Sequence, residues 1–316
     1  MAEKDVILRV KNLGMRFVTG SRHRRTVVNA VDDITFDIYR SETFGLVGES
    51  GCGKTTTGRC LIRLYNPTSG SIELEGRELV GPMTKEKRRY ITDRVSMIFQ
   101  DPIESLNPRM TIAEIIGEGL KVRGMKDEAE VQQKVFDILE RVGLTREHAS
   151  RYPHEFSGGQ RQRIGIARAL IINPTMVIAD EPVSALDVSI QAQVINLLNE
   201  LKEEMGLTIL FIAHNLSVVK YFSDRVGVMY KGKLVEVAKA EDIYNHPLHP
   251  YTKSLLSAIP EPDPFKEKRR VRVAYDPSVH DYSMEKPSMV EVFPEHFLYA
   301  SPSEIAAVKR AEGEKL

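Results

Sequence analysis

Short apolar runs separated by turn residues dominate the first part of the chain. Runs rich in β-branched residues at Val6 to Val10, Ile34 to Ile38 and Thr43 to Val47 predict strands, the last of them buried. A helix is expected over residues 54 to 65, and a strand over Gly70 to Leu74 follows a cluster of turn residues. The order strand, glycine loop, helix, strand indicates an α/β fold.

The middle of the chain changes to helical periodicity. Apolar residues have helical spacing from Thr111 to about Leu144 and from Gln160 to Ile172, which predicts an inserted helical subdomain. Strand and helix then alternate again, so the centre of the sheet is expected to be parallel. The predicted elements are Met176 to Ala179, Ile190 to Glu204, Thr208 to Ala213, Val226 to Tyr230 and Lys233 to Val237. After residue 246 prolines become frequent and periodicity weakens, so an irregular extension is expected there.

Charge and composition narrow the classes of function. Lys plus Arg and Asp plus Glu both total 44, so no global field draws the chain onto nucleic acid. No apolar run approaches the roughly 20 residues that cross a bilayer, and the first residues lack the order of a signal peptide. Cys52 and Cys60 match no disulfide framework. These features favour a cytoplasmic location.

The segment from Gly48 to Thr55 fits the phosphate-loop pattern GxxxxGK[ST] and lies between a predicted strand and a predicted helix. Its glycines let backbone N–H groups point at phosphate oxygens, and the helix presents its positive end to the same anion. Lys54 would reach the outer phosphates, and the Thr55 hydroxyl would bind Mg²⁺. The alternative is a plain strand-to-helix turn.

Two acids, Asp180 and Glu181, end the apolar run that starts at Thr175. Acids at the end of a buried strand are costly unless a metal or a reaction uses them. Asp180 suits Mg²⁺, and Glu181 could polarise the water that attacks the γ-phosphate. The alternative is a helix-capping acid.

A second anion cradle is predicted at Phe156-Ser157-Gly158-Gly159-Gln160, just before an arginine-rich helix. Ser-Gly-Gly at a helix N-terminus offers backbone donors to a phosphate. Ser157 is also a good capping residue, and the two roles are compatible.

These three motifs, in this order, resemble the nucleotide-binding subunits of ABC transporters over roughly residues 6 to 240. Gln100 matches the family's Q-loop, which touches Mg²⁺ and water and links the site to the membrane partner. Ser184-Ala-Leu-Asp187 resembles the D-loop, and His214 resembles the switch histidine that contacts the γ-phosphate. Phe17 stands where the family keeps an aromatic residue that stacks on adenine, although a core role for Phe17 is nearly as good an interpretation.

The resemblance implies a fold, a domain organisation and a set of site residues. The fold would be a P-loop NTPase (RecA-like) α/β core with an antiparallel β subdomain, an inserted helical subdomain and an irregular C-terminal extension. The nucleotide-binding domain would cover residues 1–245, with the helical subdomain at about 102–172, and the extension would cover 246–316. Catalytic residues would be Lys54, Gln100, Glu181 and His214, and Mg²⁺ ligands would be Thr55, Gln100 and Asp180. Nucleotide-binding residues would be Phe17, Gly48, Glu49, Ser50, Gly51, Cys52, Gly53, Lys54, Thr55, Thr56, Ser157, Gly158, Gly159, Gln160 and Asp187.

The family's mechanism places Ser157 and Gly159 on a partner's nucleotide, because they cannot reach their own phosphate loop. Two subunits would then bury two ATP molecules head to tail, and hydrolysis would reopen the dimer. The partner would be a homologous ATPase subunit, in a heterodimer or a homodimer. The same system would contain two transmembrane permeases and an extracytoplasmic substrate-binding protein, with this chain on the cytoplasmic face of the membrane.

Longer runs narrow the resemblance to oligopeptide and dipeptide importer ATPases. These runs are Gln100 to Met110, Arg151 to Ser157, Val183 to Gln193 and Asn245 to Leu256. The segment Arg270 to Asp281 and the run starting at Glu295 look most like the second ATPase of the oligopeptide pair. Some relatives hold an iron–sulfur centre in a C-terminal cysteine cluster, but no cysteine follows Cys60, so no cluster is expected.

Three alternatives remain open at this stage. Import of nickel or another small solute competes with peptide import, because the ATPase never touches the cargo. An ATPase of DNA repair or translation would usually carry two cassettes or a long coiled coil, and the sequence has neither. A regulatory module with a dead site would lack some of Lys54, Asp180, Glu181 and His214, which are all present.

Overall fold

The computed structural model describes residues 5–20, 25–101, 105–214, 216–260, 265, 267 and 270–313. Positions 102–104, at the predicted start of the helical subdomain, lie outside these residues. In the described part of the chain, no helix has the length and apolar character that crossing a membrane requires.

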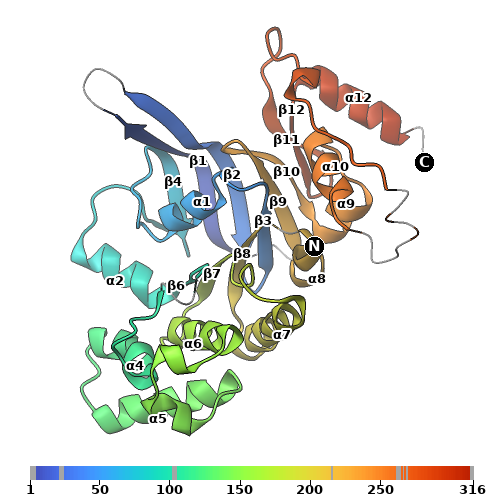
Figure 1. The fold of residues 1–316 in the computed structure, drawn as a ribbon. Helices are drawn as coiled ribbons and strands as arrows, with labels where there is room; N and C mark the ends of the chain where they lie inside the picture. Colours follow the sequence, from blue (N-terminus) through green and yellow to red (C-terminus); the bar gives the residue numbers. More distant parts are fainter. Residues whose placement is uncertain are drawn as a thin grey trace.

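An eight-stranded sheet runs through the middle of the molecule in the order β11-β12-β10-β9-β3-β8-β7-β6 (Figure 1). Its strands are β3 (Thr43–Val47), β6 (Val95–Ile98), β7 (Met176–Asp180), β8 (Thr208–Ala213), β9 (Arg225–Tyr230), β10 (Lys233–Lys239), β11 (Ser288–Phe293) and β12 (His296–Ala300). The pairs from β9 through β3, β8 and β7 to β6 are parallel. Strands β3, β7 and β8 are buried at every position, as expected for parallel strands covered on both faces. The predicted parallel centre is confirmed.

A second, antiparallel sheet has the order β2-β1-β4-β5. It contains β1 (Val6–Thr19), β2 (Thr26–Tyr39), β4 (Ser69–Leu74) and β5 (Arg77–Glu78). The predicted strands at Val6 to Val10 and Ile34 to Ile38 are parts of β1 and β2, which are both 14 residues long. Buried side chains of this sheet share a hydrophobic core with Leu46 of β3 and Cys60 of the first helix. The expected antiparallel β subdomain is therefore present.

Helices cover the sheets and form a separate layer at the bottom of Figure 1. The α-helices are α1 (Lys54–Leu61), α2 (Lys85–Arg94), α4 (Ile112–Val122), α5 (Glu128–Arg141), α6 (Gly158–Leu170), α7 (Val188–Met205), α8 (Leu216–Phe222), α9 (Ala240–Asn245), α10 (Pro250–Ser257) and α12 (Pro302–Gly313), with short 3₁₀ turns at Arg146–Ser150, Pro153–Glu155 and Pro277–Val279. The helix expected over 54 to 65 ends at Leu61, because Arg63 turns into the left-handed region at φ 59°.

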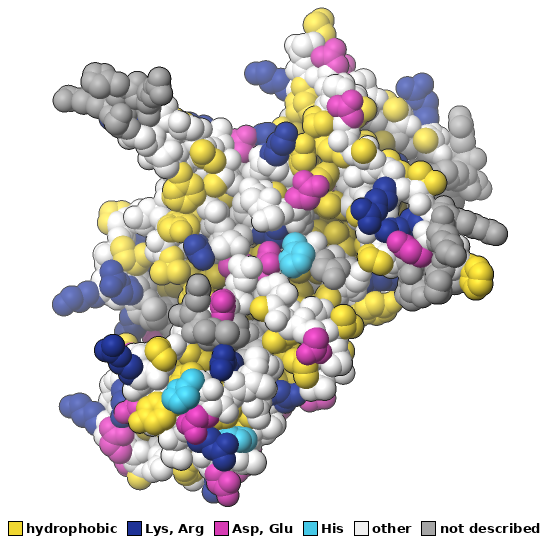
Figure 2. Space-filling model, in the orientation of Figure 1, with side chains coloured by type: hydrophobic (Ala, Val, Ile, Leu, Met, Phe, Trp, Pro, Cys, Tyr) yellow, Lys and Arg dark blue, Asp and Glu magenta, His cyan; other side chains and the backbone are white. Residues whose placement is uncertain are grey.

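The helical subdomain consists of α4, α5 and α6 with the first two 3₁₀ turns. The periodicity from Thr111 to Leu144 is divided between α4 and α5: Gly124 takes a φ of +94°, and Asp127 caps α5 by accepting from the amides of Ala129 and Glu130. A capping box of Thr111 and Glu114 starts α4. Figure 2 shows charged side chains of both signs mixed over this layer.

The C-terminal region is more regular than its sequence suggests, which corrects the expectation of an irregular extension after residue 246. It contains α10, the antiparallel hairpin β11–β12 and α12. Glu236 and Val237 of β10 pair with Leu298 and Phe297 of β12, so the hairpin extends the main sheet. The pairing partner lies about 60 positions away in the sequence, and local periodicity cannot report it.

Candidate active site

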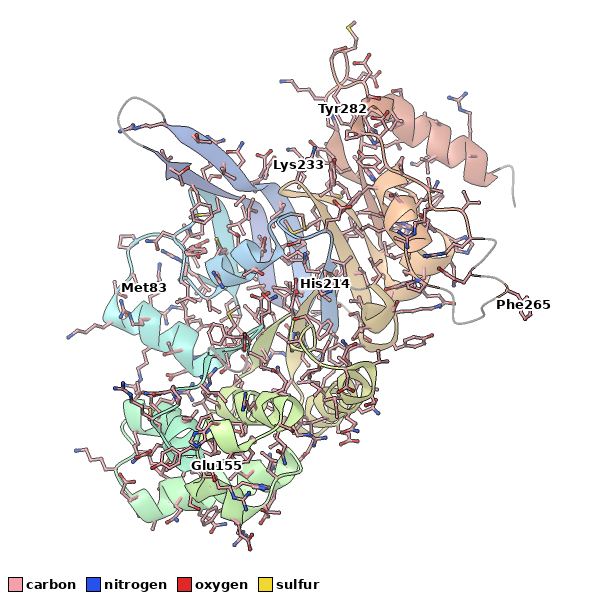
Figure 3. The ribbon with its side chains drawn as sticks, viewed as in Figure 1. Met83, Glu155, His214, Lys233, Phe265 and Tyr282 are labelled. Atoms are coloured by element: carbon pink, nitrogen blue, oxygen red, sulfur yellow. The ribbon has the colours of Figure 1, made fainter. Side chains whose placement is uncertain are left out.

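Four neighbouring strands of the main sheet end at one place. The phosphate loop follows β3, Gln100 follows β6, Asp180 ends β7 and His214 follows β8. Because carboxyl ends of parallel strands share one edge of a sheet, residues far apart in the sequence meet there. Figure 3 shows His214 near the middle of the molecule, where the sheet meets the helical layer.

The phosphate loop needs glycine at particular positions. Gly48 has a φ of +150°, and a Cβ there would lie 2.2 Å from the carbonyl oxygen of Met229. Gly53 has a φ of +111°, and its Cβ would lie 2.2 Å from the carbonyl oxygen of Ala30. Side chains at either position would collide with backbone, so the loop reaches this tight path only with glycine.

Lys54 is held inside the loop. Its Nζ donates to the carbonyl oxygens of Gly48 at 2.8 Å and Glu49 at 3.0 Å, and the residue is buried. These bonds fix the ammonium group near the N-terminus of α1, and the first turn of this helix carries no acidic residue. Positive charge and the positive helix end thus coincide, which favours an anion.

Thr55 and Asp180 form the second part of the site. The Thr55 hydroxyl donates to Asp180 Oδ1 at 2.8 Å. Burial raises the pKa of Asp180 above its ordinary value, while the hydroxyl of Thr55 and the charge of Arg59 oppose that shift. Mg²⁺ prefers hydroxyl and carboxylate oxygens. A buried carboxylate beside a hydroxyl fits such a cation, which would offset the cost of burying the charge.

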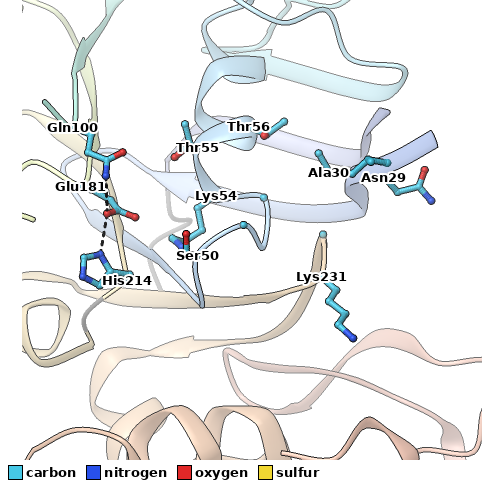
Figure 4. A pocket seen from close by; sticks show the side chains of 14 residues that line it. Asn29, Ala30, Ser50, Lys54, Thr55, Thr56, Gln100, Glu181, His214 and Lys231 are labelled. Carbon is cyan, nitrogen blue, oxygen red and sulfur yellow. Dashed lines mark hydrogen bonds and ion pairs between the residues drawn. The ribbon is translucent and has the colours of Figure 1, made fainter. Parts of the chain in front are cut away.

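Glu181 is the centre of the third part. Its Oε2 accepts from Gln100 Nε2 at 3.3 Å and lies 2.9 Å from His214 Nδ1 (Figure 4). Its backbone N–H donates to Ile212 of β8 at 2.9 Å, and its carbonyl accepts from the Ser184 hydroxyl at 3.1 Å. The carboxylate is therefore oriented by groups from three strand ends, next to the phosphate loop.

A cleft of about 620 Å³ joins Lys54 and Thr55 to Gln100, Glu181 and His214. It is lined by Val28, Asn29, Ala30, Ser50, Gly51, Gly53, Lys54, Thr55, Thr56, Gln100, Glu181, His214, Lys231 and Gly232 (Figure 4). The lining residues from β2 and from the turn after β9 are not among the site residues predicted from the sequence. No motif marks them, although the left-handed backbone of Lys231 (φ 45°) before Gly232 is typical of a tight turn.

The Ser157 segment lies at the start of α6. The Ser157 hydroxyl accepts from the Gln160 amide at 3.3 Å, and the Gln160 side chain accepts from the Ser157 amide at 3.0 Å, which completes a capping box. A Cβ on Gly159 would lie 2.7 Å from Ile190 of α7, so α6 and α7 meet closely. Within the described residues, none of positions 157–160 lines the cleft beside Lys54.

Comparison with known proteins shows which family the chain belongs to. The ABC transporter family model matches residues 31–184, and the model described as the oligopeptide/dipeptide transporter C-terminal region matches residues 235–284. The oligopeptide transport ATP-binding protein OppF of Bacillus subtilis (strain 168) is 58% identical over 97% of this chain and 99% of its own length. The chain belongs to the ABC transporter ATP-binding proteins, in the oligopeptide and dipeptide group. The expected family is confirmed, and the protein is an ABC ATPase.

Other relatives of this ABC ATPase agree. The dipeptide transport ATP-binding protein DppF of Lactococcus lactis subsp. cremoris (strain MG1363) is 50% identical over 98% of this chain and 99% of its own length. A solved structure described as a dimeric post-hydrolysis state of the ATP-binding cassette MJ0796 with ADP and Pi matches with a TM-score of 0.67 and 27% identity, covering 74% of this chain and 98% of that one. The P-loop NTPase fold expected from the sequence is therefore confirmed.

Phe17 and Asp187 are among the expected site residues of the ABC ATPase that do not line this cleft. Phe17 packs edge-on against Tyr65, with ring centroids 5.4 Å apart, while its partner in β2, Val28, lines the cleft. Adenine stacking on Phe17 stays a prediction. Asp187 caps α7 by accepting from the Ile190 amide at 3.0 Å and from the Ser189 hydroxyl at 2.7 Å, bonds that lower its pKa. A role for Asp187 in a dimer also stays a prediction.

Proposed function

We propose that this ABC ATPase powers the import of oligopeptides or dipeptides through partner membrane permeases. The relatives compared above are named for oligopeptide or dipeptide transport, and their likeness covers nearly the whole chain, including the C-terminal region. This similarity favours peptides over nickel or another small solute as cargo. The chain would act as a peripheral subunit on the cytoplasmic face of the membrane, and the system would include an extracytoplasmic binding protein.

The observation that carries the proposed chemistry is the convergence of Lys54, the Thr55–Asp180 pair and Glu181 at one edge of the sheet. In phosphoryl transfer, catalysis is largely positioning and stabilisation of charge. Lys54, already fixed on two carbonyl oxygens, would meet the outer phosphates of ATP. Glycine-loop amides and the start of α1 would hold the remaining phosphate oxygens.

Glu181 would orient the attacking water. Gln100 and His214 both contact Oε2 of its carboxylate, so the direction of the other oxygen, Oε1, is defined. His214 would also contact the γ-phosphate. Thr55, Asp180 and Gln100 would hold Mg²⁺, which when bound neutralises charge on the β and γ oxygens.

The segment Ser157 to Gln160, the predicted second anion cradle, would contact the nucleotide bound by a second subunit. Its position outside the cleft of its own chain supports this arrangement, in a homodimer or with a homologous ATPase. In this proposal residues 1–245 form the nucleotide-binding domain, with a helical subdomain at about 102–172 that transmits closure to the permease. Residues 246–316 form the C-terminal extension.

The test of this assignment is the substitution Lys54→Ala. The phosphates lose their buried cationic partner, so steady-state phosphate release from ATP should fall about 100-fold or more. Lys126→Ala, which removes an exposed lysine before α5, is the matched control and should hydrolyse ATP like the wild type. Unchanged hydrolysis in Lys54→Ala would rule out the assigned site.

The cargo is tested separately in cells. A strain lacking this chain should lose uptake of a radiolabelled oligopeptide and regain it on complementation, while nickel uptake stays unchanged. Loss of nickel uptake with normal peptide uptake would reverse the choice of cargo.

A further inference from the structure

The side chain of Tyr251 connects the C-terminal region to the phosphate loop by a hydrogen bond. Tyr251 is the second residue of α10, and its hydroxyl accepts a hydrogen bond from the Glu49 amide at 3.1 Å. The two residues are 202 positions apart. Tyr251 is 1% exposed, so water does not compete for this bond.

The bond acts on the same peptide group that holds Lys54. The carbonyl of Gly48 and the N–H of Glu49 belong to one planar peptide unit, and Lys54 Nζ donates to that carbonyl at 2.8 Å. Tyr251 therefore holds one edge of the plane and Lys54 the opposite edge. Rotation of this peptide would turn the carbonyl away from Lys54, and the Tyr251 hydroxyl opposes that rotation.

Tyr251 is itself firmly placed. Its ring packs against Tyr230 and Tyr275, with centroid distances of 4.5 and 5.4 Å, and its amide donates to His249 Nδ1 at 3.0 Å. The fully buried carboxylate of Glu236 in β10 accepts from the amides of Leu248 at 2.8 Å and His249 at 3.0 Å, just before α10.

The added hairpin contributes to the same anchor. His296 of β12 contacts Glu236 through Nε2 at 2.7 Å. The position of the Tyr251 hydroxyl thus depends on β10, α10 and β12 together.

We infer that Tyr251 is a positioning residue for ATP hydrolysis. It holds the Gly48–Glu49 peptide so that Lys54 is directed into the cleft, and through it the C-terminal region sets the affinity of the phosphate loop for nucleotide. The inference rests on the role that the proposed function gives to Lys54. Among the described residues, Tyr251 does not itself line the cleft, so it acts through the phosphate loop.

The test is Tyr251→Phe in the full-length chain, which deletes the hydroxyl and keeps the ring. Loss of one buried hydrogen bond should raise the KM for ATP about 3- to 10-fold, with a smaller decrease in kcat. Amide hydrogen exchange at Glu49, measured without nucleotide, should accelerate at least about 3-fold. Tyr275→Phe is the control: its ring lies in the same aromatic cluster, and neither KM nor Glu49 exchange should change.

Folding and function are separated by the same measurements. A merely structural role would lower the melting temperature of Tyr251→Phe and leave KM and Glu49 exchange as in the wild type, which would overturn the inference. Rapid exchange of Glu49 in the wild-type chain would overturn it without any variant. If Lys54→Ala abolishes turnover but Tyr251→Phe behaves as the wild type, only this inference fails and the proposed function stands.

Discussion

At the scale of single residues, Glu181 is held through both its backbone and its side chain. Its φ of 46° lies in the left-handed region, which costs a residue other than glycine about 1–3 kcal/mol. The strained turn is held by the Glu181 amide on Ile212 and by the Ser184 hydroxyl on the Glu181 carbonyl. Strain maintained by such contacts is typical of a functional position, and here it directs the carboxylate between Gln100 and His214.

Glu181→Gln should bind ATP with an affinity near that of the wild type and hydrolyse it about 100-fold more slowly or worse, because the amide cannot accept a proton from water. Phosphate release and binding of a fluorescent ATP analogue measure the two quantities. The stalled variant should also accumulate a closed dimer that elutes early in size-exclusion chromatography with ATP. Glu203→Gln, an exposed change on α7, serves as control. Rapid turnover in Glu181→Gln would exclude the water-orienting role.

At the scale of elements, sequence patterns predicted those parts whose signal is local. Strands β3, β7 and β8 are continuous apolar runs, and motif residues follow them directly, so Lys54, Thr55, Asp180, Glu181 and His214 could be placed at one sheet edge in advance. The hairpin β11–β12 could not be found this way. Burial does not alternate along β11, and although it does along β12, that strand depends on pairing with the distant β10.

Tyr251 and Lys231 could not be predicted from local patterns for the same reason. Tyr251 follows prolines in a stretch without clear periodicity. Its contact with Glu49 depends on the packing of α10 next to the phosphate loop. Lys231 lines the cleft because the turn after β9 passes the loop, where the Gly232 amide donates to the Cys52 carbonyl at 2.8 Å. Contacts between residues far apart in the sequence cannot be predicted from local periodicity.

The start of α10 should make stability sensitive to acid. Burial lowers the pKa of His249 from its ordinary 6.5 to about 4, with Glu236 and Glu304 opposing the shift and His280 and Lys253 adding to it. Above pH 6.5 the imidazole is neutral in both folded and unfolded chains, so it adds no pH dependence. Between pH 6.5 and about 4 only the unfolded chain takes up this proton, and the free energy of unfolding should fall by roughly 3 kcal/mol in total.

Urea unfolding at a series of pH values measures this decrease. A His249→Asn variant keeps its neighbours His280, His296 and Glu236, retains a capping acceptor and removes only the one imidazole. His249→Asn should therefore show a shallower loss of stability between pH 6.5 and 4. Identical pH profiles for the two chains would contradict the assignment.

At the scale of the whole molecule, the two anion cradles of the ABC ATPase lie on different parts of the fold. Lys54 is the first residue of α1, while Ser157 caps α6 of the helical subdomain, and Figure 1 shows these two helices apart from each other. In the proposed function, one chain would therefore present half of each of two sites, and a complete site would need a second subunit.

Ser157→Arg tests that geometry. The bulky cation should block the partner's nucleotide, so ATP-dependent dimerisation should be lost and turnover should fall about 100-fold, while ATP affinity of the separate subunit stays within about 2-fold of the wild type. Analytical ultracentrifugation and analogue binding measure the two effects. Ser150→Arg, an exposed change on the same subdomain, should affect neither. Weakened ATP binding by the isolated Ser157→Arg subunit would argue that the segment serves its own site.

The C-terminal hairpin also determines where the main sheet stops. Without β12, β10 would be an edge strand with unpaired backbone amides and carbonyls, next to the buried side chains of Val235 and Val237. An exposed strand edge of this kind is a template for intermolecular strand pairing and aggregation. With the hairpin in place the last strand is β11, a six-residue segment that exposes Ser288 and Glu291. A short edge strand with exposed Ser288 and Glu291 discourages the self-association that an uncovered β10 would promote.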